Sequence, residues 1–425
     1  MRKFFFISFI ILWNSAFSCS DKEKPVLLTK LKADRTIADN RSFFKTDLIK
    51  NKIEKTVQIL PDQSTEKRWL GSFWAMSLLR YRSAATDQAI RMALDKFESY
   101  SLSFQRALLE VIITLYPNEF VPQIQHVLLK VKNPKLYAMC IHYLTKNLQD
   151  SSESFLSHMT ENFSDWRQNP ILQMLHLGLK RNKMNDIPSL RELLSHPFPD
   201  NAVVLFSLQR ADRRFPGIVI IRNRDGTFLR HQSGELFYIQ QLTLSSSNMP
   251  GYLTNGNSPQ GIYSMQGSDK SENVFIGPTP NLQLVIPFEV PPSHYFHSRE
   301  YKILEWDIEI YERLLPEGWK NYMPFYETYF AGQAGRSEII AHGTTINPDY
   351  YLSEVFYPLT PSQGCLTALE RWDPNTGRCL RSDQVSLINA LIDIQGLFGY
   401  LVVVEINDEK RQVEIEDVNQ LIFQN

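Results

Sequence analysis

Two short segments in the C-terminal half of the chain hold residues that can act together as a thiol nucleophile and its base. Residues 340–344 read IAHGT, and residues 361–367 read PSQGCLT. A cysteine thiol is a weak nucleophile until it loses its proton, so a catalytic cysteine needs a base within hydrogen-bond reach. The two segments therefore predict Cys365 as the nucleophile and His342 as its base.

The glycine before the cysteine has a physical role of its own. Gly364 permits the tight backbone conformation of a turn. In such a turn the N–H groups of Gln363, Gly364 and Cys365 face one concavity, where they can stabilise the oxyanion that thiolate attack creates. Ser362, Gln363 and Gly364 are therefore predicted to form the oxyanion loop.

The order of these segments resembles the L,D-transpeptidase (YkuD-type) catalytic domain, whose signature is a His-Gly element followed by Ser-His-Gly-Cys. A third segment, NSPQGIY at residues 257–263, is similar to the family's Thr-Pro-x-Gly-x-aromatic segment, which leads into a strand beside the active site. All three motifs occur in the family's order, and the resemblance covers about residues 215–407. It implies a mostly-β catalytic domain that uses neither a cofactor nor a metal ion.

The chain departs from the family pattern at three places. Gln363 replaces the usual second histidine, the interval from His342 to Cys365 is longer than the common form, and Thr367 stands where an Arg or Asn is often found. The nucleophile and base are retained, and Gln363 can still supply a backbone N–H. The residues expected to contact the substrate or hold its carboxylate are Gly343, Thr344, Thr367, Tyr329, Arg336, Arg371 and Arg378.

The resemblance implies a specific reaction on peptidoglycan stem peptides. The Cys365 thiolate would attack the carbonyl of a meso-diamino-acid residue in a tetrapeptide stem and expel D-alanine. An amine acceptor would then resolve the thioester and form a cross-link. One alternative is L,D-carboxypeptidase action or hydrolysis of a lipoprotein–peptidoglycan link at the same site. A second is a non-catalytic peptidoglycan-binding lipoprotein, which Gln363 and Thr367 favour.

The first residues have the form of an export signal. Two basic residues follow Met1, and residues 4–13 are almost entirely apolar. This run is too short to span a bilayer comfortably as a permanent helix, which predicts a cleaved signal peptide over residues 1–18.

The segment ending at Cys19 resembles a bacterial lipobox, in which the cysteine is lipidated. A lipid on Cys19 would anchor the mature chain at the periplasmic face of a membrane. Ser20 favours the outer membrane in a bacterium with two membranes. The alternative is an ordinary signal peptide that happens to contain a cysteine.

Hydropathy patterns predict an α+β multidomain protein, with an all-helical, repeat-like domain before the mostly-β one. Residues 19–64 are polar and weakly periodic, which predicts a tether. Apolar residues recur at helical spacing through residues 65–205, as in Phe104, Leu108, Val111 and Leu115. The catalytic domain is expected over residues 213–407, followed by a C-terminal tail over residues 408–425.

Local patterns within the C-terminal domain predict several strands and one late helix. Ser382 is placed to cap this helix and Gly396 to end it. Strands are expected at residues 217–221, 236–244, 261–265, 282–287 and 400–406, and the helix at residues 383–395.

Composition excludes some classes of function. The chain has 45 Lys and Arg against 46 Asp and Glu, so it lacks the positive field that nucleic-acid binding needs. Its 425 residues are ample for buried cores, and the helical domain is available to recruit a protein partner.

The remaining cysteines and histidines give weaker signals. Cys140 lies in an apolar stripe and is predicted to be a buried hydrophobe, and Cys379 is predicted to be an idle thiol in a turn. His294 and His297 lack a third ligand at metal spacing, so surface histidines are expected there.

Overall fold

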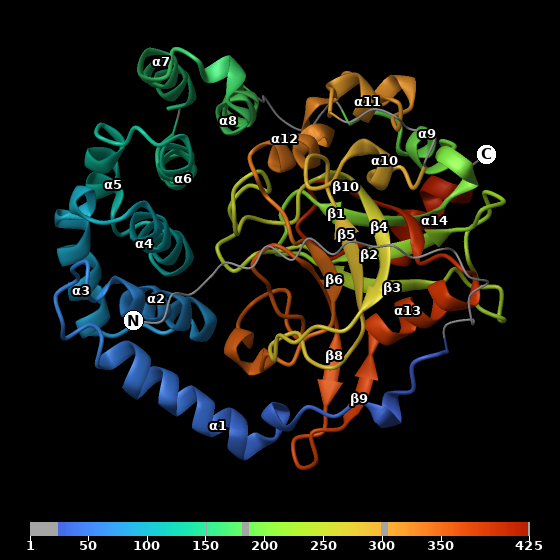
Figure 1. Cartoon of the computed structure of the whole chain (residues 1–425), viewed down its shortest axis with the longest axis horizontal. Coiled ribbons are helices and arrows are strands. Elements are labelled where there is room, and N and C mark those ends of the chain that lie inside the picture. Colours follow the sequence, from blue (N-terminus) through green and yellow to red (C-terminus); the bar gives the residue numbers. More distant parts are fainter. Residues whose placement is uncertain (1–23, 150, 181–186, 299–304, 424–425) are drawn as a thin grey trace.

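The computed structural model describes residues 24–149, 151–180, 187–298 and 305–423. These residues form two lobes, a crescent of helices and a β-rich lobe (Figure 1). Cys19 and the predicted signal peptide lie outside the described residues. The lipid anchor therefore stays a prediction.

The helical lobe consists of short helices joined by tight connections. Ser83, Ser101 and Asn133 accept backbone N–H groups at the starts of α3, α4 and α6, which explains why these helices begin where they do. The helices are α2 (Glu66–Leu79), α3 (Ala84–Asp95), α4 (Leu102–Leu115), α5 (Val121–Leu128), α6 (Pro134–Thr145), α7 (Ser152–Asn162) and α8 (Pro170–Lys180). They follow one another along an arc (Figure 1), so an all-helical lobe is present as predicted.

The core of the helical lobe is built from the predicted apolar stripes. Phe104, Leu108, Val111 and Leu115 of α4 are all buried. Cys140 of α6 is also fully buried among apolar side chains, as the sequence indicated.

The segment expected to be a tether is folded from residue 24 onward. It comprises the single turns η1 (Leu28–Lys30) and η2 (Asp34–Thr36), helix α1 (Ala38–Asp47) and the π-helical turn η3 (Leu48–Glu54). Val26 exchanges two hydrogen bonds with the Asn389 side chain of the β lobe, at 2.7 and 3.1 Å. Ile53 is buried in the main core. This segment therefore forms a strap that passes along both lobes (Figure 1).

The β lobe contains an eight-stranded sheet that closes into a barrel in the order β1-β10-β4-β5-β6-β7-β3-β2. Only the β1–β10 and β6–β7 pairs in this barrel are parallel. The strands are β1 (Val203–Arg210), β2 (Gly217–Arg222), β3 (Tyr238–Leu242), β4 (Gly261–Asp269), β5 (Asn281–Val285), β6 (Ile340–His342), β7 (Leu366–Ala368) and β10 (Phe398–Asn407).

Strand β1 was not predicted, because the sheet was expected to begin at residue 217. All eight residues of β1 are buried, and it pairs with both β10 and β2. A continuous buried run has no alternation of apolar and polar residues, so periodicity does not distinguish it from a buried helix. The five strands that were predicted correspond to β2, β3, β4, β5 and β10.

Helices and a hairpin surround the barrel. Ser382 caps α13 by accepting the Val385 N–H at 3.0 Å, as predicted. The remaining α-helices are α9 (Leu190–Ser195), α10 (Pro292–Tyr295), α11 (Ile308–Glu312), α12 (Glu327–Gln333), α13 (Asp383–Asp393) and α14 (Ile415–Phe423), and the hairpin pairs β8 (Glu370–Trp372) with β9 (Cys379–Ser382). Single helical turns lie at Phe97–Ser99, Trp166–Gln168, Pro199–Asn201, Glu317–Trp319, Met323–Tyr326 and Pro348–Tyr351.

The C-terminal residues are part of the folded lobe as well. Val418 of α14 is fully buried, and Asp417 pairs with the buried Arg210 guanidinium at 2.6 Å. The 408–425 segment is therefore docked as far as residue 423 and does not hang free as a tail.

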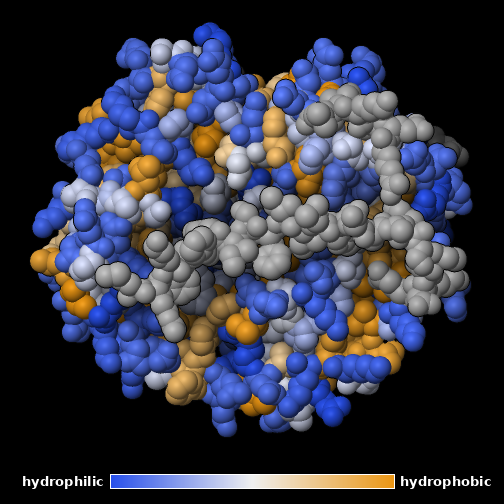
Figure 2. Space-filling model, viewed as in Figure 1, coloured by the Kyte–Doolittle hydropathy of each residue, from blue (hydrophilic) through white to orange (hydrophobic). Residues whose placement is uncertain are grey.

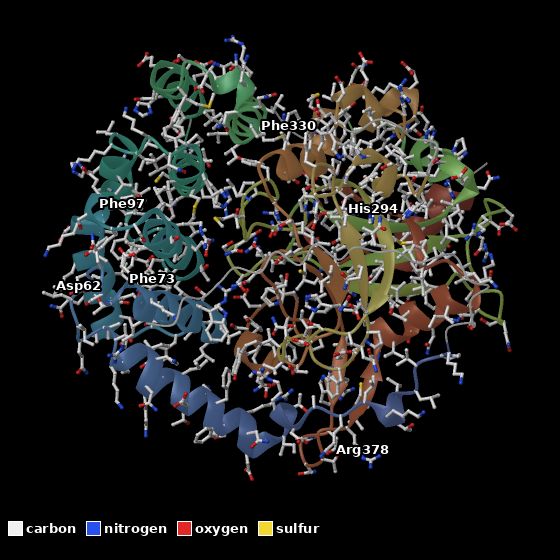
Figure 3. The ribbon with its side chains drawn as sticks, viewed as in Figure 1. Asp62, Phe73, Phe97, His294, Phe330 and Arg378 are labelled. Atoms are coloured by element: carbon white, nitrogen blue, oxygen red, sulfur yellow. The ribbon has the colours of Figure 1, made fainter. Side chains whose placement is uncertain are left out.

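The two lobes pack against each other over several elements. Helix α8 contacts α12, whose buried Phe330 is marked between the lobes in Figure 3. The visible face is mainly hydrophilic, with apolar residues in separate patches (Figure 2). Among the described residues, no helix combines the length and apolar character needed to cross a bilayer. The architecture is thus α+β, with a helical lobe followed by a barrel lobe.

Candidate active site

Cys365 lies on a tight turn immediately before β7. Gly364 has φ +114°, and a Cβ at this position would overlap the Arg336 guanidinium and the Gly256 carbonyl. Glycine is therefore required before the cysteine, as the sequence predicted. The Cys365 side chain is partly exposed, and its thiol donates to the Glu338 carbonyl at 3.7 Å.

The turn is closed by the Ser362 hydroxyl. This hydroxyl donates to the Cys365 carbonyl at 2.8 Å and accepts the Gly364 N–H at 2.9 Å. The Gly364 N–H is thus occupied within the turn, so it does not serve as a free oxyanion donor. Gln363 is exposed, and its N–H and that of Cys365 remain as the candidate donors.

The Arg336 side chain stabilises the turn that carries Cys365. Its side chain is 6% exposed, and its terminal nitrogens lie within hydrogen-bond distance of five backbone carbonyls. Four of these carbonyls belong to the loop 251–257 and the fifth to Gly364. The guanidinium therefore joins this loop to the nucleophile turn. It does not hold a substrate carboxylate, which corrects one of the sequence-based alternatives.

The segment 257–263 lies against the nucleophile turn. Its Ser258 hydroxyl donates to the Gly364 carbonyl at 3.0 Å. Gly261 then begins β4 with φ +130°, packed closely against α12 and the turn that precedes it. The motif thus positions the cysteine turn beside a barrel strand.

His342 ends β6, the strand that pairs with the one after Cys365. The register places Ala341 beside Leu366 and His342 beside Thr367. Continued one residue back from β7 into the turn, this register sets Cys365 level with Ile340, two residues before His342, and strand alternation would give the two side chains the same face. A rise of about 3.3 Å per residue and a strand spacing of about 4.8 Å place the two Cα atoms about 8 Å apart. Side chains of this length can meet across that separation.

The hydrogen bonding of the imidazole defines its tautomer. His342 Nδ1 lies 2.5 Å from the carbonyl oxygen of Gly343. A carbonyl can only accept, so Nδ1 carries the proton and Nε2 is left with the lone pair. His342 is 6% exposed, and burial lowers its pKa to about 4, opposed by the bond to Gly343. The ring is therefore neutral at pH 7 and able to accept a proton.

The thiol is also neutral at rest. Burial raises the pKa of Cys365, whereas the Ile340 N–H and the nearby Arg336 charge lower it in part. Among the described residues the thiol donates to the Glu338 carbonyl and has no hydrogen bond to His342, so proton transfer to the imidazole would require the thiol to turn.

Glu370 is a buried acid that contacts the two residues after His342, and the sequence did not predict it. Its carboxylate accepts the Thr344 N–H at 2.8 Å and the Ser382 hydroxyl at 2.7 Å, and it packs against the Cα of Gly343. Burial raises its pKa to about 7, opposed by these hydrogen bonds. The acid stands among alternating residues of a short strand, so no local motif marked it.

Three further residues predicted to contact the substrate are buried among other side chains. Thr344 and Thr367 are buried and both bond to Thr360, at 3.3 and 2.8 Å. Tyr329 is buried in an aromatic cluster with Phe288 and Tyr311.

The two remaining arginines lie on the β8–β9 hairpin. Arg371 is exposed on β8, and Arg378 lies in the hairpin turn (Figure 3). The main chain of Arg378 forms an isolated bridge with Lys32 of the strap.

The remaining chemical residues are engaged elsewhere. His294 and His297 bond to Gln266 and Ser264 of β4, each at 3.0 Å, and His294 is marked in Figure 3. Cys379 is buried in β9. Within the ranges described, no three His, Cys, Asp or Glu side chains gather in a way that would hold a metal ion.

The helical lobe contacts the loop that supports the nucleophile turn. Asn255 of this loop donates to the Glu110 carboxylate of α4 at 3.1 Å, and Lys135 of α6 donates to Thr254 at 2.7 Å. A cavity of about 620 Å³ lies between α6 and the barrel. It is lined by His142, Lys146, Arg213, Asn257, Ser258 and Glu327, among others.

Neither Cys365 nor His342 lines this cavity, and its link to the cysteine turn is Ser258, whose hydroxyl donates to the Gly364 carbonyl. Comparison of the chain with family models, curated proteins and solved structures gave no match.

Proposed function

We propose that the protein is a cysteine acyltransferase of peptidoglycan that acts as an L,D-transpeptidase. The proposal depends above all on one observation: the parallel register of β6 and β7 puts His342 on the same face as Cys365, two residues along. A neutral imidazole whose Nε2 carries the lone pair, on the strand that pairs with the one after a glycine-cysteine turn, is suited to thiol acyl transfer once the Cys365 side chain turns from the Glu338 carbonyl toward it.

The reaction divides into two proton-coupled steps. His342 Nε2 takes the thiol proton as Cys365 Sγ bonds to the carbonyl carbon of the meso-diamino-acid residue. The bond to D-alanine then breaks, and the imidazolium returns the proton to the leaving amine. In the second step an acceptor amine attacks the thioester and gives its proton to His342, and the thiol is regenerated.

The cavity beside the turn offers room for a stem peptide. Its volume of about 620 Å³ lies within the range of small-molecule sites. Arg214 on its wall pairs with Asp212 at 2.6 Å, so Lys146 is the cation proposed to meet a carboxylate of such a peptide. In this proposal the helical lobe forms one wall of the substrate site.

The first test is acylation by a carbapenem-type β-lactam. The intact protein is expected to gain the mass of one opened lactam, and Cys365→Ala should gain none. Cys379→Ala is the matched control, because it removes another thiol and should keep the adduct. Absence of an adduct on a folded wild-type protein would contradict the enzyme proposal.

The second test distinguishes the acceptors. Disaccharide-tetrapeptide is incubated with the protein, and the products are analysed by mass. A cross-linked dimer supports transpeptidation, whereas a disaccharide-tripeptide alone assigns the site to an L,D-carboxypeptidase.

A non-catalytic peptidoglycan-binding protein is the second candidate. The occupied Gly364 N–H favours it, because it leaves fewer donors for an oxyanion. This candidate predicts binding of stem peptide by both the wild type and Cys365→Ala, with neither adduct nor product.

The proposed location follows from the proposed substrate. We place the protein in the periplasm, anchored by a lipid on Cys19, with the outer membrane favoured in a bacterium with two membranes. The mass of the mature N-terminus tests this assignment, and Cys19→Ala should release the protein from the membrane fraction.

A further inference from the structure

A second cavity, of about 300 Å³, lies between the strap, the end of α2 and two loops of the β lobe. Arg35 and Arg41 border it from the strap side, and residues 345–350 border it from the loop that follows His342. Neither Cys365 nor His342 lines this cavity, so its use does not depend on the proposed acyl transfer.

The cavity carries an excess of positive charge. Arg35 and Arg41 are both partly buried, so each guanidinium has lost part of its contact with water. Within the described part of the chain, no carboxylate lies within 4 Å of either guanidinium. Asp349 interacts with Arg41 from beyond that distance. Two guanidinium groups therefore border the cavity without an ion pair within 4 Å among the described residues.

Arg41 also has an unused donor. Its Nε is shielded from solvent and has no hydrogen-bond partner among the described residues. A secluded donor without an acceptor costs free energy unless a ligand supplies the acceptor. Burial lowers the pKa of both arginines, and the charge of Arg41 lowers the pKa of Arg35 further.

The walls of the cavity are apolar and partly aromatic. The Phe44 and Phe275 rings lie 5.8 Å apart in a tilted arrangement, and the Arg35 guanidinium lies 3.9 Å from the centroid of Phe275 and 5.1 Å from that of Phe44. These contacts hold Arg35 over the rings while its edge stays available for hydrogen bonding. The remaining apolar lining comes from Leu78, Val274 and Ile346.

We propose that this cavity is a binding site for a small monocarboxylate with an apolar body. The carboxylate would lie between the Arg35 and Arg41 guanidinium groups, where bidentate donors match its planar geometry. The apolar body would lie against Phe44 and Phe275. A cavity of about 300 Å³ is at the lower end of ligand-site sizes, so it admits a single-ring compound and excludes a stem peptide.

Benzoate is the probe for this site, with inorganic phosphate as a comparison. Isothermal titration of the full folded chain with benzoate is expected to show saturable binding with one site. Arg41→Gln should raise the Kd about tenfold, because one charge-assisted contact is lost. Arg41→Lys should give an intermediate Kd, since it keeps the charge without the fork geometry.

Lys45→Gln is the matched control, because it removes the same charge from an exposed position on the same helix. It should leave the Kd of benzoate unchanged. An unchanged thermal unfolding profile of the free variants checks that each one folds.

Three results would overturn the proposal. They are no saturable binding of benzoate to the wild type, equal effects of Arg41→Gln and Lys45→Gln, and tighter binding of inorganic phosphate than of benzoate. The last result would assign the cavity to phosphoryl groups instead.

Discussion

Replacing Arg336 tests how the nucleophile turn is held. Five backbone carbonyls lie within hydrogen-bond distance of its two terminal nitrogens, four from the loop 251–257 and one from Gly364. The amide of Arg336→Gln has two N–H groups and can satisfy two of these carbonyls. A net value of about 1 kcal/mol per hydrogen bond predicts a loss of about 2–3 kcal/mol in the free energy of unfolding.

The charge of Arg336 has a separate effect that a second variant isolates. The guanidinium lowers the pKa of the Cys365 thiol, so Arg336→Gln should raise that pKa further. Arg336→Lys keeps the charge and loses the fork. It should therefore destabilise the fold while changing the thiol pKa less than Arg336→Gln does.

Two measurements on the same samples check these expectations. Urea unfolding followed by tryptophan fluorescence gives the difference in unfolding free energy. The pH dependence of iodoacetamide alkylation at Cys365 gives the thiol pKa, read by mass spectrometry. A destabilisation below about 1 kcal/mol in Arg336→Gln, with an unchanged alkylation profile, would refute the reasoning.

Two further predictions concern pH. Between its ordinary pKa of 4.5 and about 7, Glu370 keeps a proton in the folded protein that the unfolded chain has lost, so stability falls as pH rises through this window. Urea unfolding of Glu370→Gln at pH 5 and pH 8 should therefore favour the variant at the higher pH by about 3 kcal/mol, and a constant difference would contradict the assignment. Because burial lowers the pKa of His342 to about 4, acylation of Cys365 should lose rate only as pH falls toward 4. An acidic limb near 6.5 in stopped-flow acylation would indicate a solvated histidine instead.

Much of the fold was predictable where a local pattern determines the element. The stripe at Phe104, Leu108, Val111 and Leu115 identified α4, and Ser382 identified the start of α13. Strand β1 lacked such a pattern, because its side chains are buried on both faces. Its two edges are paired with β10 and β2. The folded strap was missed because its apolar residues are few and unevenly spaced, and those that are buried, such as Leu48 and Ile53, lie in a turn that packs mainly on α2.

The candidate site shows the same division. Gly364 was predictable because a positive φ and close backbone approach require glycine. The roles of Arg336 and Glu370 were not predictable, because each depends on which loops the fold brings around a buried charge. Sequence order placed His342 before Cys365, whereas only the β6–β7 register brings them to one face.

The contact between the strap and the β lobe limits the distance from a lipid on Cys19 to the folded protein. Val26 is bonded to Asn389, and seven residue steps separate it from Cys19 in the sequence. At no more than about 3.6 Å per residue, these steps span about 25 Å. An anchored molecule would then lie close to the bilayer surface. A force on the anchor would reach the folded protein at Val26, which is bonded to the β lobe.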